Sequence, residues 1–87
     1  MKIVALPIKI IAVFEPENKP PIPYKFKVKI GDSLETVKVD KVISTEKKRM
    51  AGIDSFIYQC QSYIDGVERR YELKYIIGSC QWQLYKA

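Results

Sequence analysis

The sequence predicts an all-β domain built from six antiparallel strands. Apolar and polar residues alternate through most of the chain, which is the period of a strand with one buried face. Turn-forming pairs separate these runs at Gly31-Asp32, Asp65-Gly66 and Gly78-Ser79. The chain has 87 residues, enough for one core, so residues 1–87 are expected to form a single small β domain.

The first two strands are predicted over residues 3–14 and 24–30. In the second, Phe26 and Val28 share one face, and the alternate positions carry Lys25, Lys27 and Lys29. The intervening residues 15–23 contain four of the five prolines, which lack a backbone donor for a ladder. This segment is therefore predicted to be a loop.

Four further strands are predicted over residues 34–45, 55–64, 67–77 and 80–86. Within 34–45 the apolar parity changes between Val39 and Val42, which predicts a bulge near Asp40-Lys41. Asp65-Gly66 is typical of a type I′ hairpin turn, which needs positive φ at both positions. Residues 46–54 contain Gly52 and are predicted to be a flexible loop.

Two-residue turns fix the pairing of the strands that they join. Three apolar pairs follow from these registers: Tyr58 with Leu73, Tyr75 with Trp82, and Phe26 with Val37. A flat meander would leave one apolar face in water, so the six strands are expected to close into a small SH3-like barrel or roll. The alternative is an open single-layer sheet paired to a second copy of the chain.

The order of apolar strand motifs resembles that of uncharacterised small all-β proteins from clostridial-type bacteria. The matching residues are core positions: Phe26, Val28, Val39, Val42, Ile43, Tyr71, Leu73, Trp82 and Leu84. The resemblance covers nearly the whole chain. It implies the all-β fold and implies no activity, cofactor or binding residue.

The composition argues against catalysis. The chain has no histidine, which removes the commonest general base and the commonest zinc ligand. No serine has a neighbouring base, and the glycines form no phosphate-binding motif. Glu68 and Glu72 fall on outward positions and are expected on a solvated face. The sequence therefore predicts no enzyme, no catalytic residue, no cofactor and no metal.

The two cysteines are predicted to be core residues. The hairpin registers place Cys60 opposite Tyr71 and Cys80 opposite Ile77, which are about 20 Å apart along one strand. A disulfide needs Cα atoms within about 7 Å, so the thiols are not expected to pair. Both side chains fall on inward positions, where a free cysteine behaves as a small hydrophobe.

The net charge of +5 permits an anionic partner. The excess basic residues gather on outward positions of the first half of the chain and in the following segment: Lys9, Lys25, Lys27, Lys29, Lys38, Lys47, Lys48 and Arg49. This surface is predicted to bind a protein partner or nucleic acid, with Tyr24, Tyr63 or Tyr85 available for stacking. Lysines at these positions also keep a sheet soluble and discourage edge pairing.

The leading functional hypothesis is a non-catalytic protein-interaction module, and the alternative is a nucleic-acid-binding small β-barrel. The apolar N-terminal run is interrupted by Pro7 and Lys9 and has no cleavage site after it, so it is predicted to be a strand and the protein cytoplasmic. No membrane partner is expected. The protein is expected to be a monomer or a homodimer.

Overall fold

The computed structural model describes residues 1–87 and contains seven antiparallel strands and no helix. Their bounds are β1 (Ile3–Val13), β2 (Ile22–Ile30), β3 (Ser33–Lys38), β4 (Lys41–Met50), β5 (Ile53–Ile64), β6 (Val67–Ile76) and β7 (Gln81–Lys86). The all-β antiparallel prediction is confirmed. The predicted number of six strands is wrong, because the segment predicted as one strand over 34–45 forms two.

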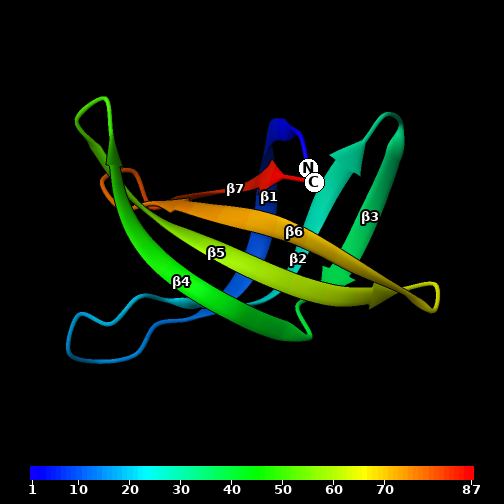
Figure 1. The fold of residues 1–87 in the computed structure, drawn as a ribbon, viewed down its shortest axis with the longest axis horizontal. Helices are drawn as coiled ribbons and strands as arrows, with labels where there is room; N and C mark the ends of the chain where they lie inside the picture. Colours follow the sequence, from blue (N-terminus) through cyan, green and yellow to red (C-terminus); the bar gives the residue numbers. More distant parts are fainter.

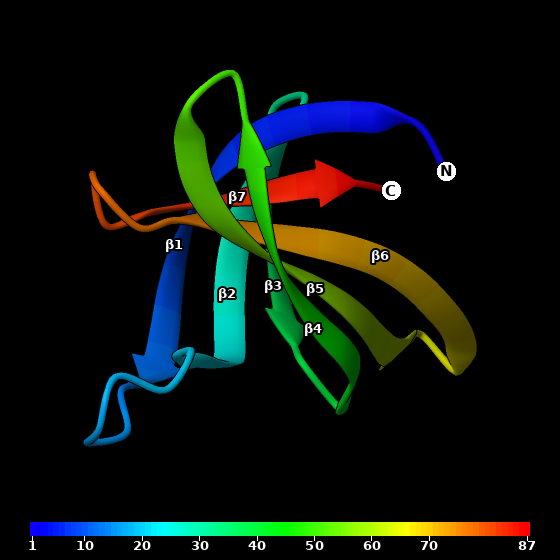
Figure 2. The same cartoon turned by 60° about the vertical axis from the view of Figure 1, so that its left-hand side comes forward.

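The strands form one sheet in the order β3-β2-β1-β7-β6-β5-β4. Strand β1 joins its two halves, since residues Ile3 to Pro7 pair with β7 and residues Ile8 to Val13 pair with β2. Its register shifts between Ile3 and Leu6, where Ala5 has a φ of 45°. At this irregularity β1 bends, and strands β1–β3 fold over strands β4–β7 to form a roll (Figures 1 and 2).

The chain changes neighbours at Val39 and Asp40. The Val39 N–H donates to the carbonyl oxygen of Tyr24, and the Asp40 N–H donates to that of Gln61, at 2.9 and 3.1 Å. One residue therefore still bonds to the β2 side, and the next bonds to β5. Strands β3 and β4 do not pair with each other, so they are the two edges of the sheet. The predicted closure into a barrel is wrong, because the strand that would close it is broken.

The predicted bulge near Asp40-Lys41 and the predicted loop over residues 46–54 also differ from the structure. The register shift in this region lies between Val42 and Ser44, a few residues beyond the predicted site. Residues 46–50 continue β4, and a two-residue turn at Ala51 and Gly52 joins it to β5. Both turn residues have positive φ, 49° and 78°, so this is a type I′ geometry with alanine at the first position. The predicted flexible loop is thus a tight hairpin.

The predicted registers are confirmed. Tyr58 pairs with Leu73, Tyr75 with Trp82, and Phe26 with Val37. The Asp65-Gly66 turn has φ values of 52° and 76°, as a type I′ turn requires. These hairpins place eleven buried side chains in one cluster: Phe26, Val28, Val37, Val39, Tyr58, Cys60, Tyr71, Leu73, Tyr75, Trp82 and Leu84.

One end of the roll is covered by the proline-rich loop between β1 and β2. Phe14 packs edge-on against Tyr75, with ring centroids 6.0 Å apart. The Tyr58 hydroxyl donates a hydrogen bond to the carbonyl oxygen of Pro21. The loop therefore caps the aromatic cluster. In this cluster the ring centroid of Trp82 lies 5.3 Å from that of Tyr58 and 4.8 Å from that of Tyr75. The opposite end, between β3 and the β5–β6 hairpin, has no such cover.

Candidate functional site

The unpaired gap between β3 and residues 62–71 of the β5–β6 hairpin is called the seam here. Figure 1 shows the β2–β3 and β5–β6 hairpins diverging on the right of the molecule. Between them lies a hollow of about 230 Å³, lined mostly by apolar side chains. The lining residues are Phe26, Val28, Ile30, Val37, Ile64, Arg69, Arg70, Tyr71, Leu84 and Ala87.

The narrow end of the seam is fixed by a polar network. The Ser62 hydroxyl donates to the carbonyl oxygen of Lys38 at 2.6 Å, and the Tyr71 hydroxyl lies 2.6 Å from the Ser62 oxygen. Because Ser62 has one proton and gives it to Lys38, Tyr71 is the donor to Ser62. Burial raises the pKa of Tyr71 well above its ordinary value, so this donor keeps its proton. Asp40 accepts the Tyr63 N–H at 2.8 Å and so covers the free edge of β5 here.

Apolar side chains mark the wide end of the seam. Ile30 precedes the Gly31-Asp32 turn and is 54% exposed. Ile64 flanks the Asp65-Gly66 turn on the facing hairpin and is 37% exposed. Arg69 shares the inward parity of Tyr71, lines the hollow and has no ion-pair partner, whereas Arg70 lies 3.6 Å from Glu68. The hollow thus has an apolar floor and a positively charged wall.

Five of the eight predicted basic residues lie together on the outer face of β1–β3. Lys9 pairs with Lys27, and Lys25 pairs with Lys38, while Lys29 lies two residues along β2. These five residues are called the lysine face. Its other outward side chains include Ile11, Val13, Leu34 and Thr36, and no acidic residue lies among them.

The lysine face accounts for the whole net charge of the protein. Removing its five lysines from the fifteen Lys and Arg leaves ten basic residues, which equal the ten Asp and Glu. The rest of the molecule is therefore formally neutral. The predicted concentration of positive charge on the first half of the chain is real, and one sheet face carries it.

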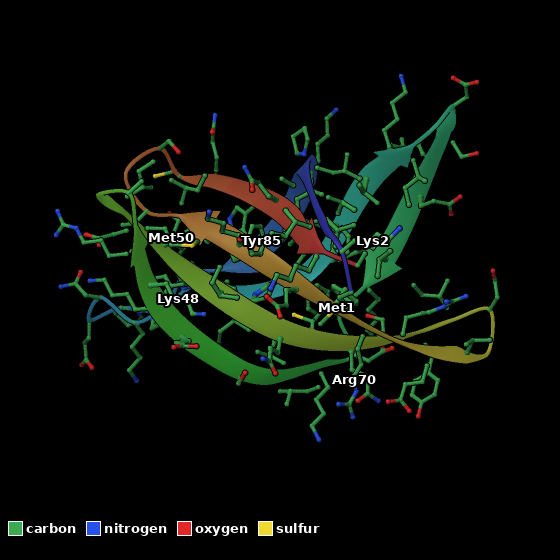
Figure 3. All side chains as sticks on the ribbon, turned by 45° about the horizontal axis from the view of Figure 1, so that its top comes forward. Met1, Lys2, Lys48, Met50, Arg70 and Tyr85 are labelled. Carbon is green, nitrogen blue, oxygen red and sulfur yellow. The ribbon has the colours of Figure 1, made fainter.

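The other three predicted basic residues, Lys47, Lys48 and Arg49, do not lie in a loop or on the lysine face. They belong to β4, the opposite edge of the sheet. Figure 3 shows Lys48 toward the left, far from β3 on the right. Lys48 lies 3.9 Å from Glu46, and Lys47 lines a surface hollow beside Phe14 at the closed end. The predicted stacking residues are also dispersed. Tyr24 lies beside Lys25, but Tyr63 is on the β5–β6 hairpin and Tyr85 is on β7 under Lys74.

The cysteines differ from each other. Cys60 is buried opposite Tyr71, as predicted, and burial raises the pKa of its thiol to about 12. Cys80 is exposed, so its prediction as a core residue is wrong. It lies in the turn before β7 and has a φ of 55°, so the inward–outward alternation of the strand does not apply to it. Both thiols are free, and the prediction that they do not pair is confirmed.

Glu72 was predicted to lie on a solvated face, and this prediction is wrong. It is 9% exposed, between Gln59 on β5 and Lys86 on β7. Ile57 and Ser55, on the same face of β5, are also buried. Both faces of β5 and β6 therefore carry buried residues in this part of the sheet, where the β4–β5 hairpin is strongly curved (Figure 1).

The apolar hollow was not predicted, although the sequence contains a signal for it. Ile30 flanks one turn and Ile64 and Val67 flank another, and exposed apolar residues are informative when they form one patch. Alternation alone assigned Ile30 and Ile64 to the core side. It does not say whether another strand covers them.

No family model matches the chain, and neither a curated protein nor a solved structure matches it. The resemblance to clostridial-type β proteins therefore stays a prediction. No three His, Cys, Asp or Glu side chains come close enough together to hold a metal ion. The structure has no helix long and apolar enough to cross a membrane.

Proposed function

We propose that this protein is a non-catalytic interaction module that binds a peptide segment of another protein in the seam. One observation carries the proposal: an apolar hollow of about 230 Å³ lies beside an uncovered strand edge. Small-molecule pockets usually measure about 300–1,000 Å³ and enclose their ligand. A smaller hollow that is open along a strand suits a few side chains of a peptide whose backbone lies on the edge.

Several other features support this function. Cys60 is buried with a raised pKa, which disfavours the reactive thiolate, and neither cysteine lines the hollow. The two free cysteines fit a reducing compartment, and we include a cytoplasmic location in the proposal. The SH3-like geometry of the roll stays a prediction.

A random peptide display library tests this function. We expect selected peptides to bind the wild-type protein with a Kd of about 1–100 μM. Ile64→Glu introduces a charge into the hollow and should weaken binding at least about tenfold. Ile53→Glu is the matched control, because Ile53 follows the Ala51-Gly52 turn at the other end of the molecule and is 52% exposed. Failure to enrich any peptide, or equal effects of the two substitutions, would overturn the proposal.

The lysine face favours a second candidate function, nucleic-acid binding. Five lysines without a neighbouring acid form a surface that phosphates would neutralise. If all five contact a single strand, the logarithm of the affinity should fall with the logarithm of salt concentration with a slope of about −3.5. Against this function, the face offers one adjacent aromatic ring, Tyr24, for stacking.

Oligonucleotide retention at low salt measures this second function. Changing Lys25, Lys27 and Lys29 together to Gln should abolish binding. Changing Lys47, Lys48 and Arg49 together to Gln removes the same amount of charge from β4 and should leave most of the oligonucleotide binding. Equal losses would indicate general electrostatic attraction, and no retention by the wild-type protein would reject this function.

A further inference from the structure

Strand β3 is an open edge that carries two charged residues, Glu35 and Lys38, but has neither a bulge nor a proline. Natural sheets blunt their edges with bulges, prolines or runs of charge. Strand β4, the other edge, has a bulge after Val42 and a cationic run over residues 47–49. Strand β3 pairs with β2 in an unbroken register and contains neither a bulge nor a proline. It is therefore the edge better suited to accept another strand.

The free backbone groups of β3 can be assigned from its register. Ile30 and Ser33 pair across a two-residue turn, so they form a hydrogen-bonded pair. Hydrogen-bonded and non-hydrogen-bonded pairs alternate along an antiparallel ladder. The N–H and C=O groups of Leu34 and Thr36 therefore point away from β2, toward the position of an added strand.

An added strand would meet different chemistry on its two faces. Its inward side chains would lie beside Glu35 and Val37, above the apolar hollow. Its outward side chains would lie beside Thr36 and Lys38, next to the lysine face. Because side chains alternate along a strand, one face of the peptide should be apolar and the other acidic.

A second copy of this chain fits the edge less well. Pairing β3 with itself would join two lysine faces, each with five lysines and no acid, into one sheet surface. Like charges on neighbouring strands are destabilising. The outward residues of β3 are Leu34, Thr36 and Lys38, so a second copy offers no carboxylate to the lysine face. Charge therefore favours a partner of a different sequence.

We propose that the partner is an extended segment of another protein in which apolar and acidic residues alternate, and that it adds to β3 as an eighth strand. This inference rests on the peptide-binding function proposed above and names the peptide and its docking geometry. The peptide backbone would pair with Leu34 and Thr36. Its apolar residues would fill the hollow, and its carboxylates would face Lys27, Lys29 and Lys38.

Synthetic peptides test the alternation. The probe is a capped heptapeptide, Asp-Val-Glu-Phe-Glu-Val-Asp, and its controls are the same peptide with every acid replaced by lysine and one with the same composition but the apolar residues consecutive. We expect the acidic alternating probe to bind at least about tenfold more tightly than either control at low salt. Its advantage over the lysine peptide should shrink as salt screens the charges. Equal binding of all three peptides would overturn the proposal.

The strand-addition geometry has its own variants. Thr36→Pro removes an N–H that points away from β2, a position at which proline is tolerated on an edge strand. It should abolish probe binding, whereas Thr36→Val, which keeps the N–H, should not. The second test leaves the protein unchanged: N-methylation of the probe at alternate residues should abolish binding for one parity and spare the other. Binding that is indifferent to both changes would overturn strand addition.

The outcomes separate this inference from the function on which it rests. Library peptides that depend on Ile64 but show neither acidic alternation nor sensitivity to Thr36→Pro would overturn the inference and leave the function standing. Absence of any Ile64-dependent peptide would overturn both. Sedimentation velocity provides the remaining test, because a dimer of the free protein that Thr36→Pro dissociates would identify a second copy as the occupant and overturn the proposed partner.

Discussion

The hydroxyl of Ser62 donates a 2.6 Å hydrogen bond to the carbonyl oxygen of Lys38 and so joins β5 to β3, two strands that are not neighbours in the sheet. The Tyr71 hydroxyl, 2.6 Å from the Ser62 oxygen, completes the link. This contact lies where the sheet comes nearest to closing. It holds the narrow end of the seam while the two hairpins diverge beyond it.

Ser62→Ala should lower the free energy of unfolding by about 1–3 kcal/mol, because it leaves the buried Tyr71 hydroxyl and the Lys38 carbonyl without a partner. Urea unfolding measures the loss. Ser44→Ala is the control, since Ser44 is exposed on β4 and its change should stay within about 0.5 kcal/mol. Similar losses for the two variants would show that the Ser62 contact does not stabilise the fold.

Stability should fall at alkaline pH. The Cys60 thiol loses its proton near pH 9 in an unfolded chain and near pH 12 in the folded one, because burial raises its pKa. Between these values the unfolded chain binds fewer protons, so the free energy of unfolding decreases by about 1.4 kcal/mol per pH unit for this group. Below pH 9 its contribution is constant. Burial also raises the pKa of Tyr58 and Tyr71, which add to the loss above pH 10.

Urea titrations at pH 7, 9, 10 and 11 measure this dependence. Between pH 9 and 11 the free energy of unfolding should fall less steeply with pH for Cys60→Ala than for the wild-type protein, whatever the stability of the variant at pH 7. The same slope in both would show that Cys60 does not contribute. Without histidine the chain has no side chain that ordinarily titrates between pH 6 and 8, so stability should be nearly constant there.

The two thiols should react at very different rates. Cys80 is exposed, whereas Cys60 is 1% exposed and has a raised pKa. An aromatic disulfide reagent at pH 8 should modify one thiol per folded chain rapidly and the second at least roughly a thousandfold more slowly. Cys80→Ser should remove the rapid phase, and Cys60→Ala should retain it. Two rapid thiols in the folded protein would contradict the burial of Cys60.

A substitution in the Ala51-Gly52 turn should stabilise the folded protein. Ala51 has a φ of 49°, a conformation that costs a residue with a Cβ about 1–2 kcal/mol and that asparagine adopts more readily. Ala51→Asn should therefore raise the free energy of unfolding by about 0.5–1 kcal/mol. Asp65→Ala makes the reverse change at the equivalent position of the other type I′ turn and should lower it by a similar amount. Thermal unfolding compares them, and a neutral Ala51→Asn would show that this turn is not strained.

Local patterns predicted the hairpins because a hairpin depends on neighbouring residues. The alternation around Asp65-Gly66 sufficed to pair Tyr58 with Leu73, and the same reasoning placed Lys25 opposite Lys38. The core of the lysine face was therefore predictable. Lys47 was misplaced because residues 46–54 carry charges and an alanine where a hairpin turn ordinarily has asparagine or aspartate. Glu72 was misplaced because alternation shows which face of a strand a residue occupies but not whether that face is covered.

Alternation and turn residues were enough to show that the chain is all-β, which residues face the core within most hairpins, and that five lysines share one face. A period of two and the geometry of a two-residue turn fix these features locally. The break of the strand predicted over 34–45 at Val39 and Asp40, and the open sheet that results, are visible only in the folded protein. The two edges, β3 and β4, are consecutive in the chain, so whether the sheet closes between them depends on the accumulated twist and packing of all seven strands. The seam follows from that break.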